Sequence, residues 1–343
     1  MNLEILNPTK YPEWDTLLLE NRDSSFFHSS AWAKVLKASY GYDPIYFVSI
    51  AAGQLFLLMP FMNIGSPLTG RRGVSLPFTD RCAPFYLDKG LLEAAVEKVI
   101  NYGKKAGWKY IEWRDKEYFS KMLPPWETYY THDLDLTNTE SGLFSSLKDS
   151  NRRNIKKAIR RGVTIKIGGT LDSLKSFYRL NCMTRKRHGL PPQPFVFFKN
   201  VFDYIISKGY GIVVSALQSN TTIGASVFFH FGKNALYKYG ASDMKFQNLR
   251  PNNLIMWEAI KWYRDRGYET FNFGRTEPYN LGLLRFKSLW GAIESPIKYY
   301  RYDCKKKNYL CRKAQIDLHK AIFSQMPTSI LRVFSRLFYK HIG

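Results

Sequence analysis

Hydrophobic residues recur at helical spacing in several stretches of the chain. Residues 254–266 form one such amphipathic pattern, and Gly267 follows it at the position where a glycine commonly ends a helix. Residues 26–40 form another, with Ser29 or Ser30 as the N-cap. Further helices are predicted over 91–105, 171–187 and 197–207.

Short runs of β-branched and aromatic residues predict strands between these helices. Two hairpins are expected, one over 44–62 and one over 211–231. Single strands are expected at 110–113, 235–240 and 270–273. Residues 64–84 are rich in Gly, Pro and Arg, so they are expected to form a loop over a surface groove.

Two of these helix–strand segments resemble each other. Residues 91–115 align with residues 251–275 without a gap, and in both a helix closes on a basic turn, a glycine and an aromatic strand that ends at an arginine. The hairpin at 46–62 has its counterpart at 211–231. The pattern predicts one mixed α/β unit built twice. The alternative is chance similarity between two helix–strand units.

Length and charge narrow the class of protein further. The chain has 343 residues, enough for two ordinary domains, and a formal net charge of +23. Such an excess of positive charge favours polyanionic partners, namely RNA, phosphorylated intermediates or an anionic membrane face. Charge alone names no partner.

Several classes of site lack their usual motifs in this sequence. The first residues show no signal-peptide pattern, and the longest nearly apolar run, 50–62, is too short to span a membrane. The four cysteines form no C-x-x-C pair and the six histidines have no ligand spacing, so we expect a reduced, cytosolic chain without a metal site. G-x-S-x-G, P-loop and Rossmann motifs are missing as well.

The sequence that remains is that of a basic, two-part α/β protein without a motif for a covalent nucleophile. Direct attack of an amine on an activated acyl group fits such a protein, because this reaction requires alignment and charge stabilisation but no covalent enzyme intermediate.

The highest local concentration of charge lies at 148–161, which holds seven cations and one acid. We expect a helix there that connects the two units. Candidates in it for binding the phosphates of RNA or of a diphosphate are Arg152, Arg153, Lys156 and Lys157. A merely solvated helix face is the alternative.

A second amphipathic pattern follows Pro327. Its apolar residues are expected on one helical face, and Arg332, Arg336 and Lys340 on another. A helix that lies in an anionic membrane surface has this pattern, so residues 328–343 are predicted to bind such a surface. The alternative is a helix that caps the core of the protein.

Three blocks of the second half resemble a known family. They read SFYRLNCMTRKRHGLPPQPFVFF, LRPNNLIMWEAIKWYRDRGYETFNFGRTE and GLLRFKSLWGA. They look like the FemA/FemB group within the GNAT acyltransferase superfamily, most of all the subgroup found beside exopolysaccharide and exosortase loci. The resemblance covers roughly residues 25–305. It implies a mixed α/β fold of two tandem GNAT-like domains, each a mainly antiparallel sheet flanked by helices.

The resemblance also implies a domain plan and an activity. The domains would span 1–140 and 141–305, the second entered through a basic helix at 147–161, and a tail would span 306–343. In characterised relatives an aminoacyl group passes from aminoacyl-tRNA to the amine of a peptidoglycan precursor. An N-acyltransferase acting on a phosphate-bearing cell-envelope precursor is therefore expected, cytoplasmic or peripheral on the inner face of the plasma membrane.

Site residues follow from the same resemblance. The family motif F-K-x-x-[FW]-G matches 286–291, which implies that Lys287 stabilises charge on the donor. A W-x-x-x-K-like segment matches 32–37, which makes Lys34 or Lys37 a candidate to bind the acceptor phosphate. Residues expected in the cleft of the second domain are Tyr239, Asp243 (a second catalytic candidate), Arg250, Asn252, Arg275 and Glu277. Their structural alternatives are strand packing for Tyr239, a turn or cap for Asp243 and Asn252, and an ion pair between Arg275 and Glu277.

Two other functions stay open. The acyl-CoA pyrophosphate loop, [QR]-x-x-G-x-[GA], has no clean match, since residues 219–225 fit it poorly. An acyl-CoA-dependent N-acetyltransferase of exopolysaccharide synthesis is therefore the weaker enzymatic alternative, and a non-catalytic GNAT pair acting as a basic scaffold is the third. No tightly bound cofactor is expected, only aminoacyl-tRNA or acyl-CoA as co-substrate.

Overall fold

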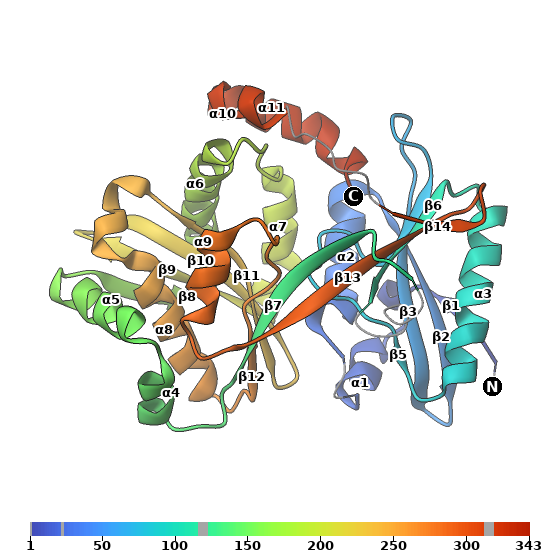
Figure 1. Cartoon of the computed structure of the whole chain (residues 1–343), viewed down its shortest axis with the longest axis horizontal. Helices are drawn as coiled ribbons and strands as arrows, with labels where there is room; N and C mark the ends of the chain where they lie inside the picture. The colour runs from blue at the N-terminus through green and yellow to red at the C-terminus, as the bar shows by residue number, and fades with distance from the viewer. Residues whose placement is uncertain (1, 22–23, 116–122, 312–318) are drawn as a thin grey trace. The chain divides into compact units, whose positions relative to one another are not determined.

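The computed structural model describes residues 2–21, 24–115, 123–311 and 319–343 (Figure 1). The chain divides into two compact units. The first comprises Met1–Tyr129, Pro296–Gln315 and Lys340–Gly343, and the second comprises Tyr130–Ser295 and Ile316–Tyr339.

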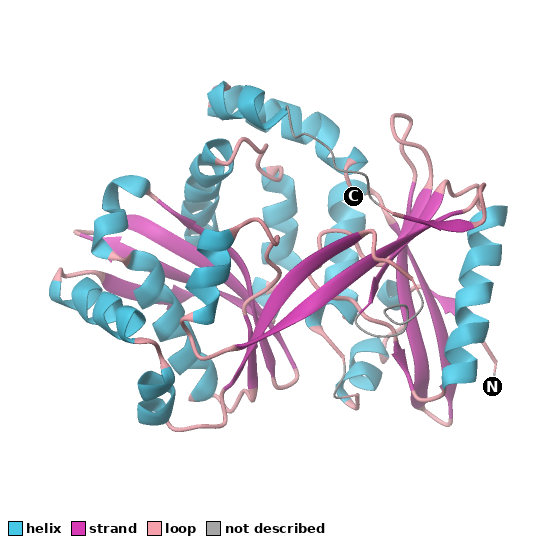
Figure 2. Ribbon diagram, in the orientation of Figure 1, coloured by secondary structure: helices cyan, strands magenta, loops and turns pink. Residues whose placement is uncertain are grey.

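The first unit is built on a mixed sheet with the strand order β1-β2-β3-β4-β6-β13, in which β5 also pairs with β3 and β14 with β13 (Figure 2). The strands are β1 (Glu4–Leu6), β2 (Asp43–Ala51), β3 (Gln54–Ile64), β4 (Arg72–Val74), β5 (Phe85–Tyr86), β6 (Tyr110–Asp115), β13 (Ile293–Asp303) and β14 (Asn308–Leu310). Its helices are α1 (Trp14–Leu19), α2 (Ser30–Tyr40) and α3 (Lys89–Lys105), with 3-10 turns η1 (Pro8–Lys10), η2 (Phe26–His28) and η6 (Tyr339–His341). Strands β4 and β6 are parallel, and the other neighbours are antiparallel.

Alternate residues of β2 pack on opposite faces of this sheet, because successive side chains of a strand point to opposite sides. Phe47 belongs to a buried cluster with Leu92 and Val99 of α3. The ring of Tyr46, the preceding residue, packs against Trp14 of α1 with centroids 5.6 Å apart. The first unit therefore buries both faces of the sheet under helices.

The second unit repeats this architecture with the strand order β7-β12-β11-β10-β9-β8. The strands are β7 (Glu127–Asp135), β8 (Thr164–Gly168), β9 (Gly211–Gln218), β10 (Thr221–Phe231), β11 (Asn234–Ser242) and β12 (Thr270–Asn272). The helices are α4 (Glu140–Ser146), α5 (Asp149–Arg160), α6 (Leu171–Arg187), α7 (Phe195–Tyr204), α8 (Pro251–Arg264), α9 (Leu281–Ser288), α10 (His319–Gln325) and α11 (Thr328–Phe338), with 3-10 turns η4 (Ile206–Lys208) and η5 (Met244–Leu249). Phe228 of β10 meets Tyr263 of α8, and its neighbour Phe229 meets Tyr239, whose ring also touches Phe177 of α6.

The expected doubling of one α/β unit is visible in the order of elements. The first unit contains β2, β3, β4, α3 and β6, and the second contains β9, β10, β11, α8 and β12 in the same sequence of pairings. After each helix a glycine with a left-handed backbone, Gly107 at φ +69° and Gly267 at φ +72°, leads into the next strand. That strand pairs in parallel with an earlier one, β6 with β4 and β12 with β11. The predicted mixed, mainly antiparallel α/β fold is confirmed.

The strand that completes each sheet was not predicted from the sequence. Residues 298–303 of β13 pair with 110–115 of β6 in the first unit. Residues 133–135 of β7 pair with 270–272 of β12 in the second. Strand β7, which follows β6 along the chain, therefore pairs with a strand of the second unit. Strand β13, which comes after β12, pairs with a strand of the first unit.

The region predicted as a loop over a surface groove, 64–84, needs correction. It contains the strand β4, and much of it is buried. Arg72 at the start of β4 is 2% exposed, and its guanidinium donates to the carbonyls of His341 and Gly343 at 2.9 and 2.6 Å. Arginines in this segment therefore hold the fold of the first unit together, which composition alone could not show.

Candidate active site

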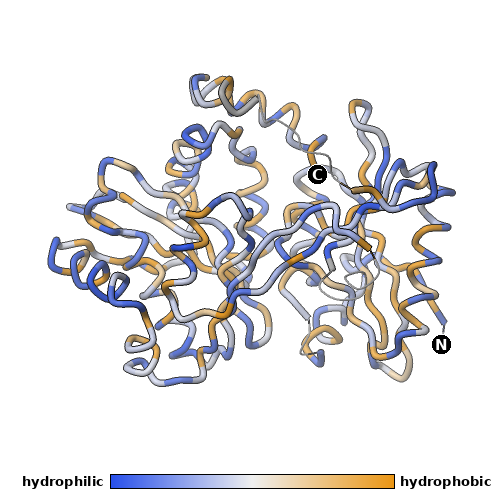
Figure 3. Tube along the Cα trace, viewed as in Figure 1, coloured by the Kyte–Doolittle hydropathy of each residue, from blue (hydrophilic) through white to orange (hydrophobic). Residues whose placement is uncertain are grey.

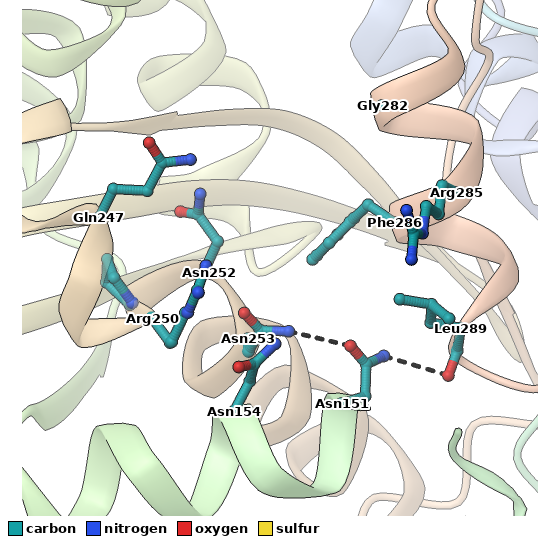
Figure 4. Close-up of a pocket in the computed structure, with 11 residues that line it drawn as sticks. Asn151, Asn154, Gln247, Arg250, Asn252, Asn253, Gly282, Arg285, Phe286 and Leu289 are labelled. Atoms are coloured by element: carbon teal, nitrogen blue, oxygen red, sulfur yellow. Dashed lines mark hydrogen bonds between the residues drawn. The ribbon is translucent and has the colours of Figure 1, made fainter. Parts of the chain in front are cut away.

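A pocket of about 240 Å³ lies in the second unit beside the N-terminus of α8 (Figure 4). Helices α5, α8 and α9 and the turn η5 supply its walls. Its lining residues are Asn151, Asn154, Gln247, Arg250, Pro251, Asn252, Asn253, Gly282, Arg285, Phe286 and Leu289.

The junction between strand β11 and helix α8 forms one wall. Asp243 caps the turn η5, and its carboxylate accepts a hydrogen bond from the Lys245 amide at 3.0 Å. Arg250 then takes a left-handed backbone at φ +60°, and Pro251, whose ring fixes φ, begins the helix. The amide groups at a helix start carry partial positive charge, so this wall favours an anionic ligand.

A buried pair of asparagines holds the other wall. Asn253 of α8 donates from Nδ2 to Oδ1 of Asn151 at 3.0 Å, and Asn151 of α5 donates to the Leu289 carbonyl at 3.1 Å (Figure 4). Asn252 donates to the Ser242 hydroxyl at 3.1 Å. These bonds join α5, α8 and the end of α9 around the pocket, and buried amides need such partners.

The pocket is electropositive. Its lining includes two exposed arginines, Arg250 and Arg285, and no acid. Helix α5, which supplies Asn151 and Asn154, is mostly hydrophilic (Figure 3). The same helix carries the four predicted phosphate-binding cations Arg152, Arg153, Lys156 and Lys157. The structure therefore brings two predicted groups together, the basic helix and the pair Arg250 and Asn252.

Lys287 lies in the last turn of α9 but is not among the lining residues of the pocket. Its side chain is 1% exposed, and Nζ donates to the carbonyls of Gly274 and Arg275 at 2.8 and 3.2 Å. His132 is buried nearby. Burial lowers the pKa of His132 and the charge of Lys287 adds to this, whereas Glu294, 3.1 Å from its Nε2, opposes the shift. Lys287 thus secures the loop between β12 and α9.

Tyr239 and Asp243 make the contacts of their structural alternatives. Tyr239 lies among aromatic rings of α6, α7 and β10. Asp243 forms the cap described above. Arg275 lies close enough to Tyr339 for its charge to oppose the rise that burial causes in the pKa of that phenol. Burial and neighbouring arginines lower the pKa of His188, and the charge of Glu277 opposes this shift.

Lys34 and Lys37 both lie on α2 of the first unit. Lys34 Nζ donates to the Ser30 hydroxyl at 3.4 Å, one turn earlier on the same helix. Lys37 is exposed in the last turn. Both amines stand on a helix whose other face is buried around Trp32, so the scaffold that carries them is rigid.

Sequence reasoning missed most of the pocket. It did not select Asn151, Asn154, Gln247, Asn253, Gly282, Arg285, Phe286 or Leu289. It also sought the pyrophosphate loop at 219–225, where Ser219 and Asn220 instead form the tight β9–β10 turn with positive φ. At the strand-to-helix junction Gln247 matches the first position of that motif, but Arg250 and Asn252 stand where the motif has glycine and glycine or alanine.

Comparisons with known proteins show a family match in the second unit and similar folds. The sequence profile of the family described as "Acetyltransferase (GNAT) domain" matches residues 145–288, which include all but one of the residues that line the pocket. The solved structure of FemX aligns at a TM-score of 0.68 and 15% identity, over 87% of this chain and 96% of FemX. A tandem GNAT protein from the clavulanic acid biosynthesis pathway aligns at 0.57 and 9% identity, over 88% of this chain and 99% of that one.

Two curated relatives are similar in sequence. The Lipid II:glycine glycyltransferase of Staphylococcus saprophyticus is 19% identical over 227 residues, covering 47% of this chain and 54% of that enzyme. The protein of the same name from Staphylococcus aureus is 19% identical over 232 residues, covering 47% and 55%. The chain spans about half the length of the curated relatives it matches.

The fold is that of the tandem GNAT protein with which the chain aligns, and residues 145–288 match the GNAT family model. The similarity to FemX and to the two glycyltransferases confirms the resemblance to the FemA/FemB group that the motifs predicted. The assignment to the subgroup near exopolysaccharide and exosortase loci stays a prediction.

Proposed function

We propose that the protein is an N-acyltransferase that moves an activated acyl group to an amine of a cell-envelope precursor. The observation that carries this proposal is the acid-free pocket with Arg250 and Arg285 at the start of α8, inside the segment that matches the GNAT profile. The names of the relatives, which are glycyltransferases acting on lipid II, support the envelope precursor as acceptor.

The reaction requires little covalent chemistry from the protein. The acceptor nitrogen forms a C–N bond to the acyl carbon, the ester C–O bond of the donor breaks, and the proton lost by nitrogen passes to the leaving oxygen. We assign Arg250 and Arg285 to the phosphate of the donor, because both are exposed cations beside the helix start. We assign Lys287 to charge stabilisation near the acyl group, whereas Asp243 already serves as the cap of η5.

Aminoacyl-tRNA is the donor we favour. Helix α5 contributes Asn151 and Asn154 to the pocket and exposes Arg153 and Lys156 beside them, so an RNA backbone could follow the helix away from the pocket. The second candidate is acyl-CoA. It is favoured by the match of residues 145–288 to a family described as "Acetyltransferase (GNAT) domain".

For the acceptor, we propose a phosphate-bearing precursor, with Lys34 or Lys37 as the candidate in the first unit for its phosphate. The candidates in the second unit for substrate contacts are Tyr239, Asn252, Arg275 and Glu277. A lipid-linked precursor would require the enzyme to work at the inner face of the plasma membrane. The segment 328–343 is our candidate for that contact.

Donor binding tests the proposal directly. Glycyl-tRNA, the same tRNA uncharged, and acetyl-CoA would be titrated into the purified protein at one physiological salt concentration, because a chain of charge +23 binds any RNA at low salt. Preference for glycyl-tRNA supports aminoacyl transfer. Saturable acetyl-CoA binding without that preference supports the acyl-CoA alternative. If neither result is seen, the non-catalytic scaffold is favoured.

A matched pair of variants locates the site. Arg250→Gln/Arg285→Gln should weaken the preferred donor at least tenfold, because each removes a charge-assisted contact to phosphate. Lys166→Gln/Lys208→Gln removes the same charge from exposed positions outside the pocket and should change affinity less than twofold. Equal effects of the two double variants would show that only the overall charge matters.

A further inference from the structure

Helix α11 packs against the second unit with one face only. Leu331 and Ser335 are fully buried and Tyr339, one turn further on, is 8% exposed. The Arg332 guanidinium lies 5.7 Å from the centroid of the Tyr178 ring in α6. The side of α11 that carries these residues is therefore docked on α6.

A second apolar face of α11 points to solvent. Ile330, Val333 and Leu337 are 52%, 61% and 56% exposed. Because successive residues of an α-helix are about 100° apart, these three side chains lie within a strip of about 60°. Helix α10 extends the exposed apolar surface with Ile322, which is 60% exposed, and the apolar positions of both helices are visible in Figure 3.

Aromatic rings border this strip on the side of the docked face. The rings of Phe323 and Phe334 have centroids 5.1 Å apart, and those of Phe334 and Phe338 are stacked at 4.6 Å. Phe338 is still 38% exposed. The apolar surface is thus continuous from α10 to the end of α11.

Cations border the strip on its other side. Arg336 is exposed and lies about 100° around the helix from Leu337. Residues 328–343 contain no acid at all. An apolar strip beside cations matches the boundary between lipid headgroups and acyl chains when the lipids are anionic. No helix in the described ranges is long and apolar enough to cross a bilayer.

We propose that this face lies in the surface of an anionic membrane, with Ile330, Val333 and Leu337 inserted below the headgroups and Arg336 on lipid phosphates. A second copy of the chain is a poorer occupant, because symmetric pairing would bring Arg336 of each copy together with no acid on either strip. The inference deepens the proposed function and rests on it only for its purpose, which is to bring the enzyme to a lipid-linked acceptor.

Vesicle binding tests the inference without any acyl transfer. The purified protein would be co-sedimented with phosphatidylcholine vesicles, with and without about 30% phosphatidylglycerol, at about 0.15 M salt. We expect at least tenfold tighter binding to the anionic vesicles. Ile330→Glu/Val333→Glu/Leu337→Glu should lose at least tenfold of that affinity, while circular dichroism stays that of the wild type because all three positions are exposed.

The control carries the same charge change elsewhere. Ile5, Leu19 and Leu87 are 44%, 55% and 56% exposed in the first unit, so Ile5→Glu/Leu19→Glu/Leu87→Glu should bind within twofold of the wild type. The inference is overturned if the wild type ignores anionic vesicles, or if both triple variants lose affinity equally. It is also overturned if the wild type is a dimer in solution that the α11 variant turns into a monomer. Because no donor is present, none of these outcomes depends on the proposed reaction.

Discussion

Asn253 of α8 donates to Asn151 of α5 at 3.0 Å, a bond between residues 102 positions apart that closes one wall of the candidate active site. Asn151 is fully buried, and its own Nδ2 donates a hydrogen bond to the carbonyl of Leu289 at the end of α9. One side chain thereby positions three helices around the pocket. The basic helix is held at the site by this amide. Arg153 and Lys156 of that helix are exposed, whereas Arg152 pairs with Asp149 and donates to the Ser145 carbonyl at 3.1 Å.

The first prediction concerns this amide. Asn151→Ala leaves Nδ2 of Asn253 without its acceptor, whereas the Leu289 carbonyl keeps the Lys148 amide at 3.1 Å. A buried polar group left unpaired costs about 1–3 kcal/mol. We expect the free energy of unfolding in urea to fall by that amount. Asn154→Ala, one turn later on α5 and only half-buried, should change it by less than about 0.5 kcal/mol. Equal losses would show that Asn151 contributes nothing specific.

The second prediction concerns Lys287, whose side chain is 1% exposed and donates hydrogen bonds to two carbonyls. Lys287→Met should therefore lower the free energy of unfolding by about 1–3 kcal/mol. It should also abolish acyl transfer under the proposed function, measured at a temperature where urea titration shows the variant folded.

Arg285→Met is the stability control, because Arg285 is exposed on the same helix. Its free energy of unfolding should stay within about 0.5 kcal/mol of the wild type. Full transfer activity in folded Lys287→Met would remove the lysine from the mechanism and leave it a purely structural clamp.

The sequence predicted most helices and strands because their signals are local. Helix α6 occupies the predicted 171–187, where Thr170 accepts from the Ser173 amide as its cap. The two glycines that end α3 and α8 adopt the left-handed backbone that their positions suggested. The repeat was visible for the same reason, since each helix–strand segment is contiguous.

The pocket and the exchanged strands could not be predicted in this way. The pocket depends on Asn151, Asn253 and Arg285, which come from three separate helices. These residues lie far apart in the sequence and form no motif of fixed spacing. Asparagine has no distinct local preference that separates a buried bridge from an ordinary turn. The pairings of β7 with β12 and of β13 with β6 join residues more than 130 positions apart, so the local sequence does not specify them.

The third prediction concerns a buried charge cluster in the first unit. Glu112 lies 3.0 Å from Arg114 and 2.8 Å from Arg301. Burial alone would raise the pKa of Glu112, but the two guanidinium groups outweigh it and hold the pKa below its usual value. Glu112→Gln leaves two cations uncompensated, Arg114 almost fully buried, and should cost about 3 kcal/mol in urea unfolding.

Its control is a carboxylate in an exposed pair. Glu93 lies 3.9 Å from Lys89 with more than half of its side chain exposed, so Glu93→Gln should cost less than about 0.5 kcal/mol. A loss at Glu112 as small as that at Glu93 would show that the buried cluster is replaceable by neutral groups.

The last prediction concerns pH. His28 is buried, Nδ1 accepts from the Ser25 amide at 3.1 Å and Nε2 lies 3.1 Å from the Ala83 carbonyl, an arrangement that fits the neutral ring with its proton on Nε2. Burial lowers the pKa of His28 to about 4, which the Ala83 contact opposes and the charge of Arg81 reinforces. In the unfolded chain the pKa returns to about 6.5.

As pH falls below about 6.5, the unfolded chain therefore gains a proton that the folded His28 refuses, and stability is lost until pH approaches 4. This shift of pKa corresponds to about 3 kcal/mol, most of it lost by pH 4.5. Urea unfolding of the wild type and of His28→Gln would be compared at pH 7.5 and at pH 4.5. The variant should lose roughly 2–3 kcal/mol less between the two pH values, although it is less stable at pH 7.5 because it lacks the Ser25 contact. Equal losses in the two proteins would mean that His28 is already protonated in the fold and that other groups set the acid sensitivity.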